Sequence, residues 1–180
     1  MILLDVDGVL TDGRITYVGA GREAKSFDVR DGVGLWLARR AGLRTGIISG
    51  RSGAAVLRRA AELHMDEVHL EVRDKLAAYR QILRRGHLRD AQICYVGDDV
   101  VDLPLLARVG LGVAVADAHP EVLRRTAFVT EARGGRGAVR EVVDAILMAQ
   151  GKRDEVLGWF DPGRAAGRGR RPAGARRSRG

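Results

Sequence analysis

Acidic side chains directly follow two apolar runs of the sequence. Residues 2–4 (ILL) lead into Asp5-Val6-Asp7-Gly8, and residues 93–96 (ICYV) lead into Gly97-Asp98-Asp99, with Asp102 three positions further on. Two carboxylates held close together in a partly buried site repel each other unless a cation or a proton relieves them. Carboxylate oxygens are also ligands that Mg²⁺ prefers. The acids therefore predict a divalent metal ion at the ends of these two segments.

A hydroxyl group and an ammonium group stand in similar places. The apolar run 46–48 ends at Ser49-Gly50-Arg51, where a hydroxyl and backbone N–H groups precede a predicted helix and suit an anion. Lys75 follows Asp74 at the start of another predicted helix. Each feature has an ordinary alternative, since Ser49 or Asp74 can be a cap and Asp98-Asp99 a solvated pair. Together, the order acid, hydroxyl, lysine, acid supplies a nucleophile, a hydrogen-bond donor to a phosphate, a positive charge that stabilises the phosphate, and a metal ligand.

The elements that must position these side chains alternate along the chain. Short β-branched runs alternate with amphipathic segments, which predicts an α/β fold with a central parallel sheet flanked by helices. In such sheets the ligand lies beyond the carboxyl ends of the strands. We expect strands at 2–6, 44–49, 67–70, 92–96, 111–114 and 128–129, and helices at 31–40, 52–63, 74–85, 101–108, 121–125 and 138–149.

A glycine-bearing turn interrupts this alternation after the first strand. Gly19-Ala20-Gly21 separates two short extended runs, 16–18 and 24–29, and so predicts a β-hairpin inserted at this point. Gly42 and Gly86 are expected to end the helices that precede them. Trp36 lies in the apolar stripe of the first helix and is expected in the core.

The order of these residues resembles the haloacid dehalogenase-like (HAD) phosphohydrolases. Their first motif, DxDx[TV][LVI], is matched by residues 5–10 (DVDGVL), the second by the strand that ends at Ser49, the third by Lys75 and the fourth, GDxxxD, by residues 97–102 (GDDVVD). Within this superfamily the chain is similar to the phosphatases of 3-deoxy-D-manno-octulosonate 8-phosphate (KDO 8-phosphate). The resemblance extends to about Gly158 and is carried by residues 5–13, 26–35, 96–104, 109–122 and 134–152. It implies a Rossmann-like HAD fold.

The resemblance also implies a Mg²⁺-dependent phosphatase that forms an aspartyl-phosphate. Asp5 is then the nucleophile, and Asp7 protonates the departing sugar oxygen and later activates water, a division of roles that the chemistry of phosphoryl transfer also favours. Ser49 and Lys75 bind the transferring phosphoryl group.

The same resemblance assigns the metal ligands. They are Asp5, the backbone carbonyl of Asp7, and Asp98. Behind them, Asp99 and Asp102 are expected to orient a water molecule or to pair with Lys75.

The expected substrate is a phosphorylated sugar acid. Arg51, beside Gly50, is a candidate fork for the substrate carboxylate, and Arg136, in the loop 134–137, is a candidate at the entrance to the site. The alternatives are a surface arginine and an ordinary helix-entry loop. Related nonulosonate 9-phosphate phosphatases tend to carry Glu at the position of Arg51, so Arg51 favours conversion of KDO 8-phosphate to KDO and phosphate in lipopolysaccharide precursor synthesis. The same reaction on a nonulosonic acid 9-phosphate is the alternative.

The chain is expected to lack a cap domain. Only about fifteen residues separate Thr11 from the first predicted helix, and no large insertion follows Arg51. In the family that this sequence resembles, the hairpin at about 14–28 associates around a tetramer and a neighbour's C-terminal segment closes the site. The resemblance therefore implies a homotetramer.

The positive charge is concentrated at the C-terminus. The net charge is +8, and residues 161–180, with seven Arg and one Asp, supply +6 of it. We expect residues 1–158 to form the phosphatase domain and 159–180 a basic, disordered tail, which is too poor in apolar residues to offset its ordering entropy. Nonspecific binding of the tail to nucleic acid, or an assembly role without catalysis, is the alternative from another functional class.

The remaining composition excludes other classes. No apolar run approaches the roughly 20 residues of a membrane span, and the start, MILLDVDGVL, has no basic region and does not predict a secretory signal. Cys94 is the single cysteine, so no internal disulfide is possible. These features predict a cytoplasmic protein.

Overall fold

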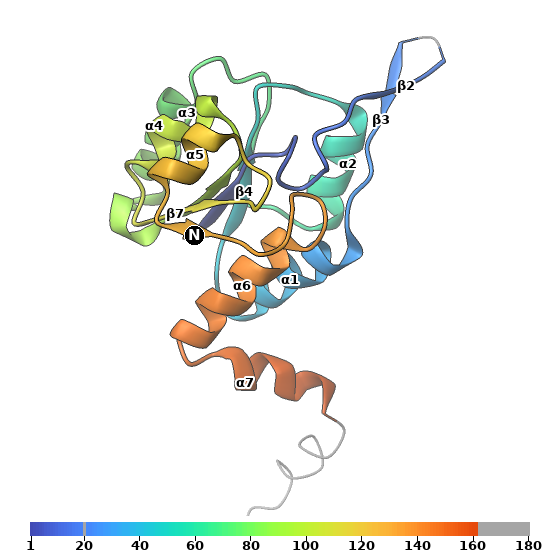
Figure 1. Cartoon of the computed structure of the whole chain (residues 1–180). Helices are drawn as coiled ribbons and strands as arrows, with labels where there is room; N and C mark the ends of the chain where they lie inside the picture. Colours follow the sequence, from blue (N-terminus) through green and yellow to red (C-terminus); the bar gives the residue numbers. More distant parts are fainter. Residues whose placement is uncertain (20, 162–180) are drawn as a thin grey trace, which may run out of the picture.

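The computed structural model describes residues 1–19 and 21–161 and has a parallel six-stranded sheet at its centre (Figure 1). The strand order is β5-β4-β1-β6-β7-β8, with parallel pairing throughout. The strands are β1 Ile2–Leu4, β4 Thr45–Ile48, β5 Glu67–His69, β6 Cys94–Gly97, β7 Leu111–Ala114 and β8 Phe128–Val129. The prediction of a parallel α/β sheet is confirmed.

Helices cover both faces of this sheet. α1 and α6 lie side by side on one face, and α3 and α4 lie on the other (Figure 1). The helices are α1 Val29–Arg40, α2 Ala54–Glu62, α3 Lys75–Gly86, α4 Leu103–Leu106, α5 Pro120–Arg125, α6 Ala138–Ala149 and α7 Arg153–Leu157, with 3₁₀ turns at Asp90–Gln92, Val100–Asp102 and Gly158–Phe160. Leu3, Leu35, Ile48, Tyr79 and Val96 are fully buried between the layers. This core fixes the strand ends that carry the acidic residues.

The predicted hairpin is present and projects away from the sheet (Figure 1). Its strands are β2 Thr16–Val18 and β3 Arg22–Ala24, paired antiparallel. The expected second strand, 24–29, is wrong in its bounds. The pairing ends where Ala24 meets Thr16, and Asp28 accepts a hydrogen bond from the Arg30 N–H, which caps α1.

The two helix-ending glycines behave differently. Gly42 has φ +81° directly after α1, as expected for the residue that ends a helix. α3 continues through Gly86, and His87 takes the left-handed conformation with φ +50°. Gly86 instead gives room to a neighbour, because a Cβ there would lie 2.9 Å from Leu88 Cδ1.

Trp36 is not a core residue, contrary to the sequence prediction. Its side chain is 38% exposed, because α1 buries Leu35 and the adjacent apolar positions instead. The Arg40 guanidinium lies 4.7 Å from the Trp36 ring centroid and 4.6 Å from that of Trp159, and Phe160 lies 5.6 Å from Trp36. These contacts attach the segment after α7 to α1.

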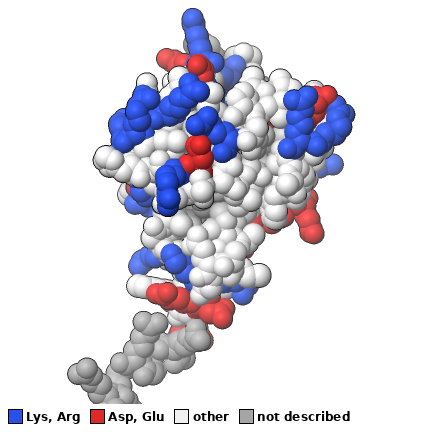
Figure 2. Space-filling view, turned by 90° about the vertical axis from the view of Figure 1, so that its left-hand side faces the viewer, with Lys and Arg blue, Asp and Glu red and all other residues white. Residues whose placement is uncertain are grey.

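Charge is dispersed over one face of the molecule. On the face shown in Figure 2, basic side chains form separate groups with acidic side chains beside them and uncharged surface between them. No helix among the described residues combines the length and the apolar character needed to cross a bilayer. The predicted basic tail falls, from residue 162 onward, outside the described residues.

Candidate active site

The carboxyl ends of three adjacent strands bring the predicted site residues together. Leu4 pairs with both Ile47 and Val96, so β1, β4 and β6 end at the same level. Asp5 then follows β1, and its N–H donates to the Val96 carbonyl at 2.9 Å. Ser49 and Asp98 follow β4 and β6 in the same way. The arrangement that the sequence predicted at the sheet edge is present.

Lys75 is buried at the centre of this edge. It is the first residue of α3, whose start is fixed by Asp74 accepting a hydrogen bond from the Ala77 N–H at 3.0 Å. Lys75 Nζ donates to Asp5 Oδ1 at 2.7 Å and to Asp102 Oδ1 at 2.7 Å. The ammonium therefore bridges the carboxylate after β1 and the carboxylate of the 3₁₀ turn.

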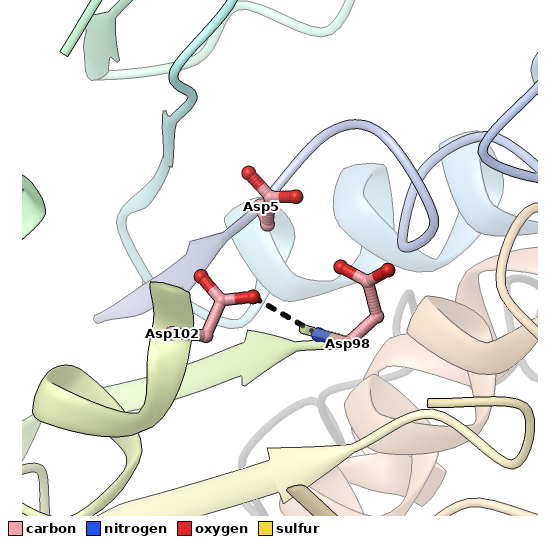
Figure 3. A group of neighbouring side chains, drawn as sticks. All are labelled: Asp5, Asp98 and Asp102. Atoms are coloured by element: carbon pink, nitrogen blue, oxygen red, sulfur yellow. Dashed lines mark hydrogen bonds between the residues drawn. The ribbon is translucent and has the colours of Figure 1, made fainter. Parts of the chain in front are cut away.

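Asp102 organises the residues after β6. Its Oδ2 accepts hydrogen bonds from the Asp98 N–H at 3.1 Å (Figure 3) and from the Asp99 N–H at 3.3 Å, while its Oδ1 accepts from the Tyr95 hydroxyl at 2.6 Å. Asp102 is fully buried. Asp99 is exposed and caps the 3₁₀ turn through the Val100 N–H. Of the two residues expected behind the site, Asp102 is the one that contacts Lys75.

The carboxylates of the site outnumber the ammonium group beside them. Burial, followed by repulsion from Asp5 and Asp102, raises the pKa of Asp98 to about 8. Burial also raises the pKa of Asp5 to about 6, although Lys75 opposes the shift. The pKa of Lys75 is raised, because the two carboxylates outweigh the effect of its own burial. One ammonium thus faces three carboxylates, and Asp98 forms no ion pair with any described residue.

This donor set fits a divalent cation. Oxygens of Asp5, Asp98 and Asp102 lie within 4.8 Å of one another (Figure 3). Both oxygens of Asp102 already accept hydrogen bonds from groups of the chain. Asp5 and Asp98 are therefore the carboxylates with capacity for a hard cation such as Mg²⁺.

Gly8 allows Asp98 to approach the loop after β1. Gly8 has φ +97°, and a Cβ at this position would lie 2.1 Å from Asp98 Oδ2. The adjacent turn is closed by the Leu10 and Thr11 N–H groups, which donate to the Val6 carbonyl at 3.0 and 3.1 Å. The motif that carries Asp5 and Asp7 thus needs glycine in its fourth position.

Asp7 points toward two cations rather than toward Asp98. Lys25 Nζ donates to Asp7 Oδ1, and Arg51 Nε lies 3.8 Å from Asp7 Oδ2. Arg51 also pairs with Glu23 of β3, with Nη2 to Oε1 at 2.5 Å. The side chain of Asp7 is therefore engaged on the hairpin side, and its backbone carbonyl is the group that it could offer to a metal ion.

A cavity of about 300 Å³ opens onto these groups. Of the predicted site residues it is lined by Asp5, Asp7, Ser49, Gly50, Arg51, Lys75, Asp98 and Asp99, and additionally by Val72, Arg73 and Val101. Ser49 Oγ accepts from the Arg51 N–H at 3.2 Å, which leaves the hydroxyl proton free to donate into the cavity. The cavity thus combines carboxylates, a hydroxyl donor, a lysine and arginines. This combination suits a phosphate ester together with a divalent cation.

Arg136 lies outside this lining. Its side chain is 69% exposed, with Nη2 4.0 Å from Asp12 Oδ2. The loop that carries it is held against the loop after β1 by the Gly135 N–H, which donates to the Val9 carbonyl at 2.8 Å, and against the segment after β7 by the Gly134 N–H, which donates to Asp117 at 2.9 Å. These contacts turn the Arg136 side chain toward solvent.

Several groups of the site were not singled out from the sequence. Tyr95 was assigned only to a buried strand, and Lys25 only to the hairpin. Asp31, a buried carboxylate that accepts from the Gly137 and Arg140 N–H groups at 3.3 and 2.8 Å, anchors the start of α6. Two acidic residues at the start of α1, Asp28 and Asp31, are typical of helix capping. Nothing in that local pattern indicates that Asp31 contacts α6, more than 100 residues later in the chain.

Comparison with protein families gives one match. Residues 62–142 match the family of haloacid dehalogenase-like hydrolases. The matched segment carries Lys75, Asp98 and Asp102.

Comparison with known proteins gives relatives over most of the chain. The 3-deoxy-D-manno-octulosonate 8-phosphate phosphatase KdsC of Escherichia coli (strain K12) is 45% identical over 158 residues, which cover 88% of this chain and 84% of the relative. The phosphatase of the same name from Moraxella catarrhalis, solved with a magnesium ion, a phosphate ion and KDO, has a TM-score of 0.86 and 37% identity over 88% of this chain and 91% of that chain. A cobalt-bound phosphatase of this kind from Haemophilus influenzae has a TM-score of 0.82 and 40% identity over 85% of this chain and 90% of that chain.

Proposed function

The chain belongs to the family of 3-deoxy-D-manno-octulosonate 8-phosphate phosphatases within the haloacid dehalogenase-like hydrolases, and from that premise we propose that it converts KDO 8-phosphate to KDO and inorganic phosphate. The reaction is a Mg²⁺-dependent hydrolysis of a phosphoric monoester. The observation that carries the proposal is the buried contact of Lys75 with Asp5 and Asp102 beside the unpaired Asp98. The proposed reaction is a step in the synthesis of lipopolysaccharide precursors.

Asp5 is the nucleophile in this proposal. Its Oδ1 is held by Lys75, so we assign the attack on phosphorus to Oδ2. The P–O bond to the sugar breaks as the aspartyl-phosphate forms. Lys75 remains in contact with Asp5 and stabilises the negative charge that develops on the phosphoryl oxygens.

Asp7 serves the leaving group and then the water. In its carboxylic acid form it gives its proton to the sugar oxygen as the ester bond breaks, and as the resulting carboxylate it takes a proton from the water that hydrolyses the aspartyl-phosphate. The Ser49 hydroxyl donates to a phosphoryl oxygen. Asp7 and Ser49 line the same cavity, so the leaving sugar oxygen and the phosphoryl group of a bound substrate would both lie within it.

Asp5, Asp98 and the backbone carbonyl of Asp7 would hold the Mg²⁺ ion. When bound, the ion supplies positive charge to the phosphate oxygens and reduces the repulsion between the phosphate and Asp5. Asp102 holds the Asp98 and Asp99 N–H groups and so fixes the backbone from which Asp98 extends.

Arg51 is the proposed ligand of the substrate carboxylate. It lines the cavity next to Gly50, and its guanidinium can bind a carboxylate through two parallel hydrogen bonds. Arg136 is kept only as a candidate at the entrance, since its side chain points to solvent.

We also propose a capless homotetramer that works in the cytoplasm. The hairpin is a two-stranded sheet with exposed Ile15, Tyr17 and Val18, and a two-stranded hairpin alone is marginally stable in water. Association around it would cover these side chains. The single cysteine, Cys94, is free and buried, which agrees with a reducing compartment.

The test is phosphate release from three substrates. We expect turnover of KDO 8-phosphate with Mg²⁺, loss of turnover with a chelator, and loss in Asp5→Asn. Asp144→Asn on α6 is the control and should keep wild-type activity. Turnover of a nonulosonate 9-phosphate alone would retain the chemistry and change the substrate, and folded protein that releases no phosphate from these esters or from an aryl phosphate would contradict the proposal.

A further inference from the structure

A buried lysine connects the hairpin to the active site. Lys25 follows β3 directly, and its Nζ donates to Asp7 Oδ1. Its side chain is only 2% exposed, whereas the strands of the hairpin are largely exposed. An ammonium group is costly to bury without a partner. The contact with Asp7 is therefore what accounts for the inward orientation of Lys25.

Two cationic side chains contact the Asp7 carboxylate, and Lys25 is the one that donates a hydrogen bond to it. The second contact, Arg51, is 43% exposed and lies 3.8 Å from Asp7 Oδ2. Arg51 is in addition drawn toward Glu23, its partner at 2.5 Å. No hydrogen bond from a backbone N–H to the Asp7 carboxylate is present among the described residues. The direction of this carboxylate thus depends mainly on Lys25.

We propose that Lys25 is a positioning residue for Asp7 that holds its carboxyl group toward the leaving oxygen of the substrate. The inference rests on the proposed function, in which Asp7 handles the proton of the leaving sugar oxygen. Misplacement of a reacting group by about 1 Å can cost about 100-fold in rate. A lysine from the hairpin would then set the efficiency of one chemical step without touching the substrate.

The choice of substrate separates this role from a purely structural one. The sugar oxygen of KDO 8-phosphate is a basic leaving group and needs a proton as the ester bond breaks, whereas the phenolate of p-nitrophenyl phosphate leaves without one. The ratio kcat/KM reports steps up to the first irreversible one, which is transfer of the phosphoryl group to Asp5. A defect in the orientation of Asp7 therefore lowers kcat/KM for the sugar phosphate selectively.

The first experiment compares Lys25→Met with Arg22→Met. Both remove one cation from the same hairpin, but Arg22 is exposed at the far end of β3. We expect Lys25→Met to lower kcat/KM for KDO 8-phosphate by about 10- to 100-fold and to change that for p-nitrophenyl phosphate by less than about threefold. Arg22→Met should leave both unchanged. Sedimentation of each variant checks that the oligomeric state is the same.

The second experiment restores the ammonium in a single folded protein. Lys25→Cys is treated with 2-bromoethylamine, which alkylates the thiol and returns an amine at nearly the original position. Lys25 also lines a cavity of about 300 Å³ beside α2, and we expect the reagent to reach the thiol from that cavity. Cys94 should not react, because burial raises its pKa to about 12. Selective recovery of kcat/KM for KDO 8-phosphate is expected.

The outcomes distinguish this inference from the proposed function. Equal losses for both substrates in Lys25→Met, or no recovery after complete alkylation of Lys25→Cys, would overturn the role of Lys25. Wild-type protein that fails to hydrolyse KDO 8-phosphate would instead overturn the proposed function. The two results are read from different proteins, so failure of the inference can be distinguished from failure of the proposed function.

Discussion

Asp98 is the carboxyl group of the site that has no ion-pair partner among the described residues. Its pKa is raised to about 8 by burial and by the neighbouring acids, so without a cation the carboxyl is mostly protonated at pH 7. A metal ion binds the carboxylate form and must displace this proton. We therefore predict that the apparent affinity for Mg²⁺ increases from pH 6 to pH 8, by up to about tenfold per unit, and levels off above pH 8.

Calorimetric titration of Mg²⁺ at several pH values measures this dependence. Repeating the titration in two buffers of different ionisation enthalpy counts the protons released. Affinity that stays constant between pH 6 and pH 8 would contradict the assignment of Asp98 as a ligand.

Asp102 is the residue on which the stability of the site depends most. It is fully buried and accepts hydrogen bonds from Lys75, Tyr95 and two backbone N–H groups. Asp102→Ala leaves part of the Lys75 charge uncompensated, and we predict a loss of about 3–5 kcal/mol in the free energy of unfolding. Urea denaturation measures it. Asp99→Ala, which removes only an exposed cap, should cost about 1 kcal/mol.

The sequence was informative about residues that follow strands and uninformative about those within them. Asp5, Ser49 and Asp98 could be predicted because polar groups directly after apolar runs must meet at one sheet edge, and Lys75 because it opens the helix predicted after Asp74. Tyr95 could not, because in a buried parallel strand an aromatic residue looks like any other core residue. Its hydroxyl gains importance only from Asp102, which the fold of the following turn places beside it.

At the scale of elements, the loop after β1 is defined by one glycine. Gly8 has φ +97° and sits where a Cβ would overlap Asp98 Oδ2. Gly8→Ala must therefore displace Asp98 or the loop. We predict that this variant loses about 100-fold in activity and binds Mg²⁺ more weakly, as measured by phosphate release and calorimetry.

Gly42→Ala is a matched control for this substitution. Gly42 also has a positive φ, +81°, but no atom lies within 4 Å of the position of its Cβ. Both variants should lose about 1–2 kcal/mol of stability from backbone strain. Wild-type activity in Gly8→Ala would show that the approach of Asp98 to the loop is not needed.

Element types were predictable, whereas several boundaries and burial patterns were not. Apolar periodicity identified α1, but the cap at Asp28 moved its start to Val29 and shortened β3. The stripe of α1 that includes Trp36 looks like a core face, yet the aromatic residues after α7 cover it from outside. Such contacts depend on where a distant segment ends, which local patterns do not encode.

At the scale of the whole molecule, the exposed hairpin indicates assembly. Tyr17 is 70% exposed on β2, and it lies on a two-stranded sheet that no other strand extends. We predict that Tyr17→Asp reduces the proposed tetramer to smaller species, because a charge would be buried in the proposed contact. Analytical ultracentrifugation measures the change.

Met148→Asp provides the comparison for this prediction. Met148 is similarly exposed but lies on α6, away from the hairpin. It should not alter the sedimentation of the protein. A wild-type chain that sediments as a monomer would contradict the proposed assembly.

The central place of β1 has a consequence for how the protein is made. Leu3 pairs with Gly46 on one side and with Tyr95 on the other, so β1 has both edges covered only after β6, more than 90 residues later in the chain, has been synthesised. At about 5–20 residues per second, translation takes on the order of ten seconds to deliver the second partner. During that time the apolar run Ile2–Leu4 has an open edge, which is a site for chaperone binding or for aggregation of the nascent chain.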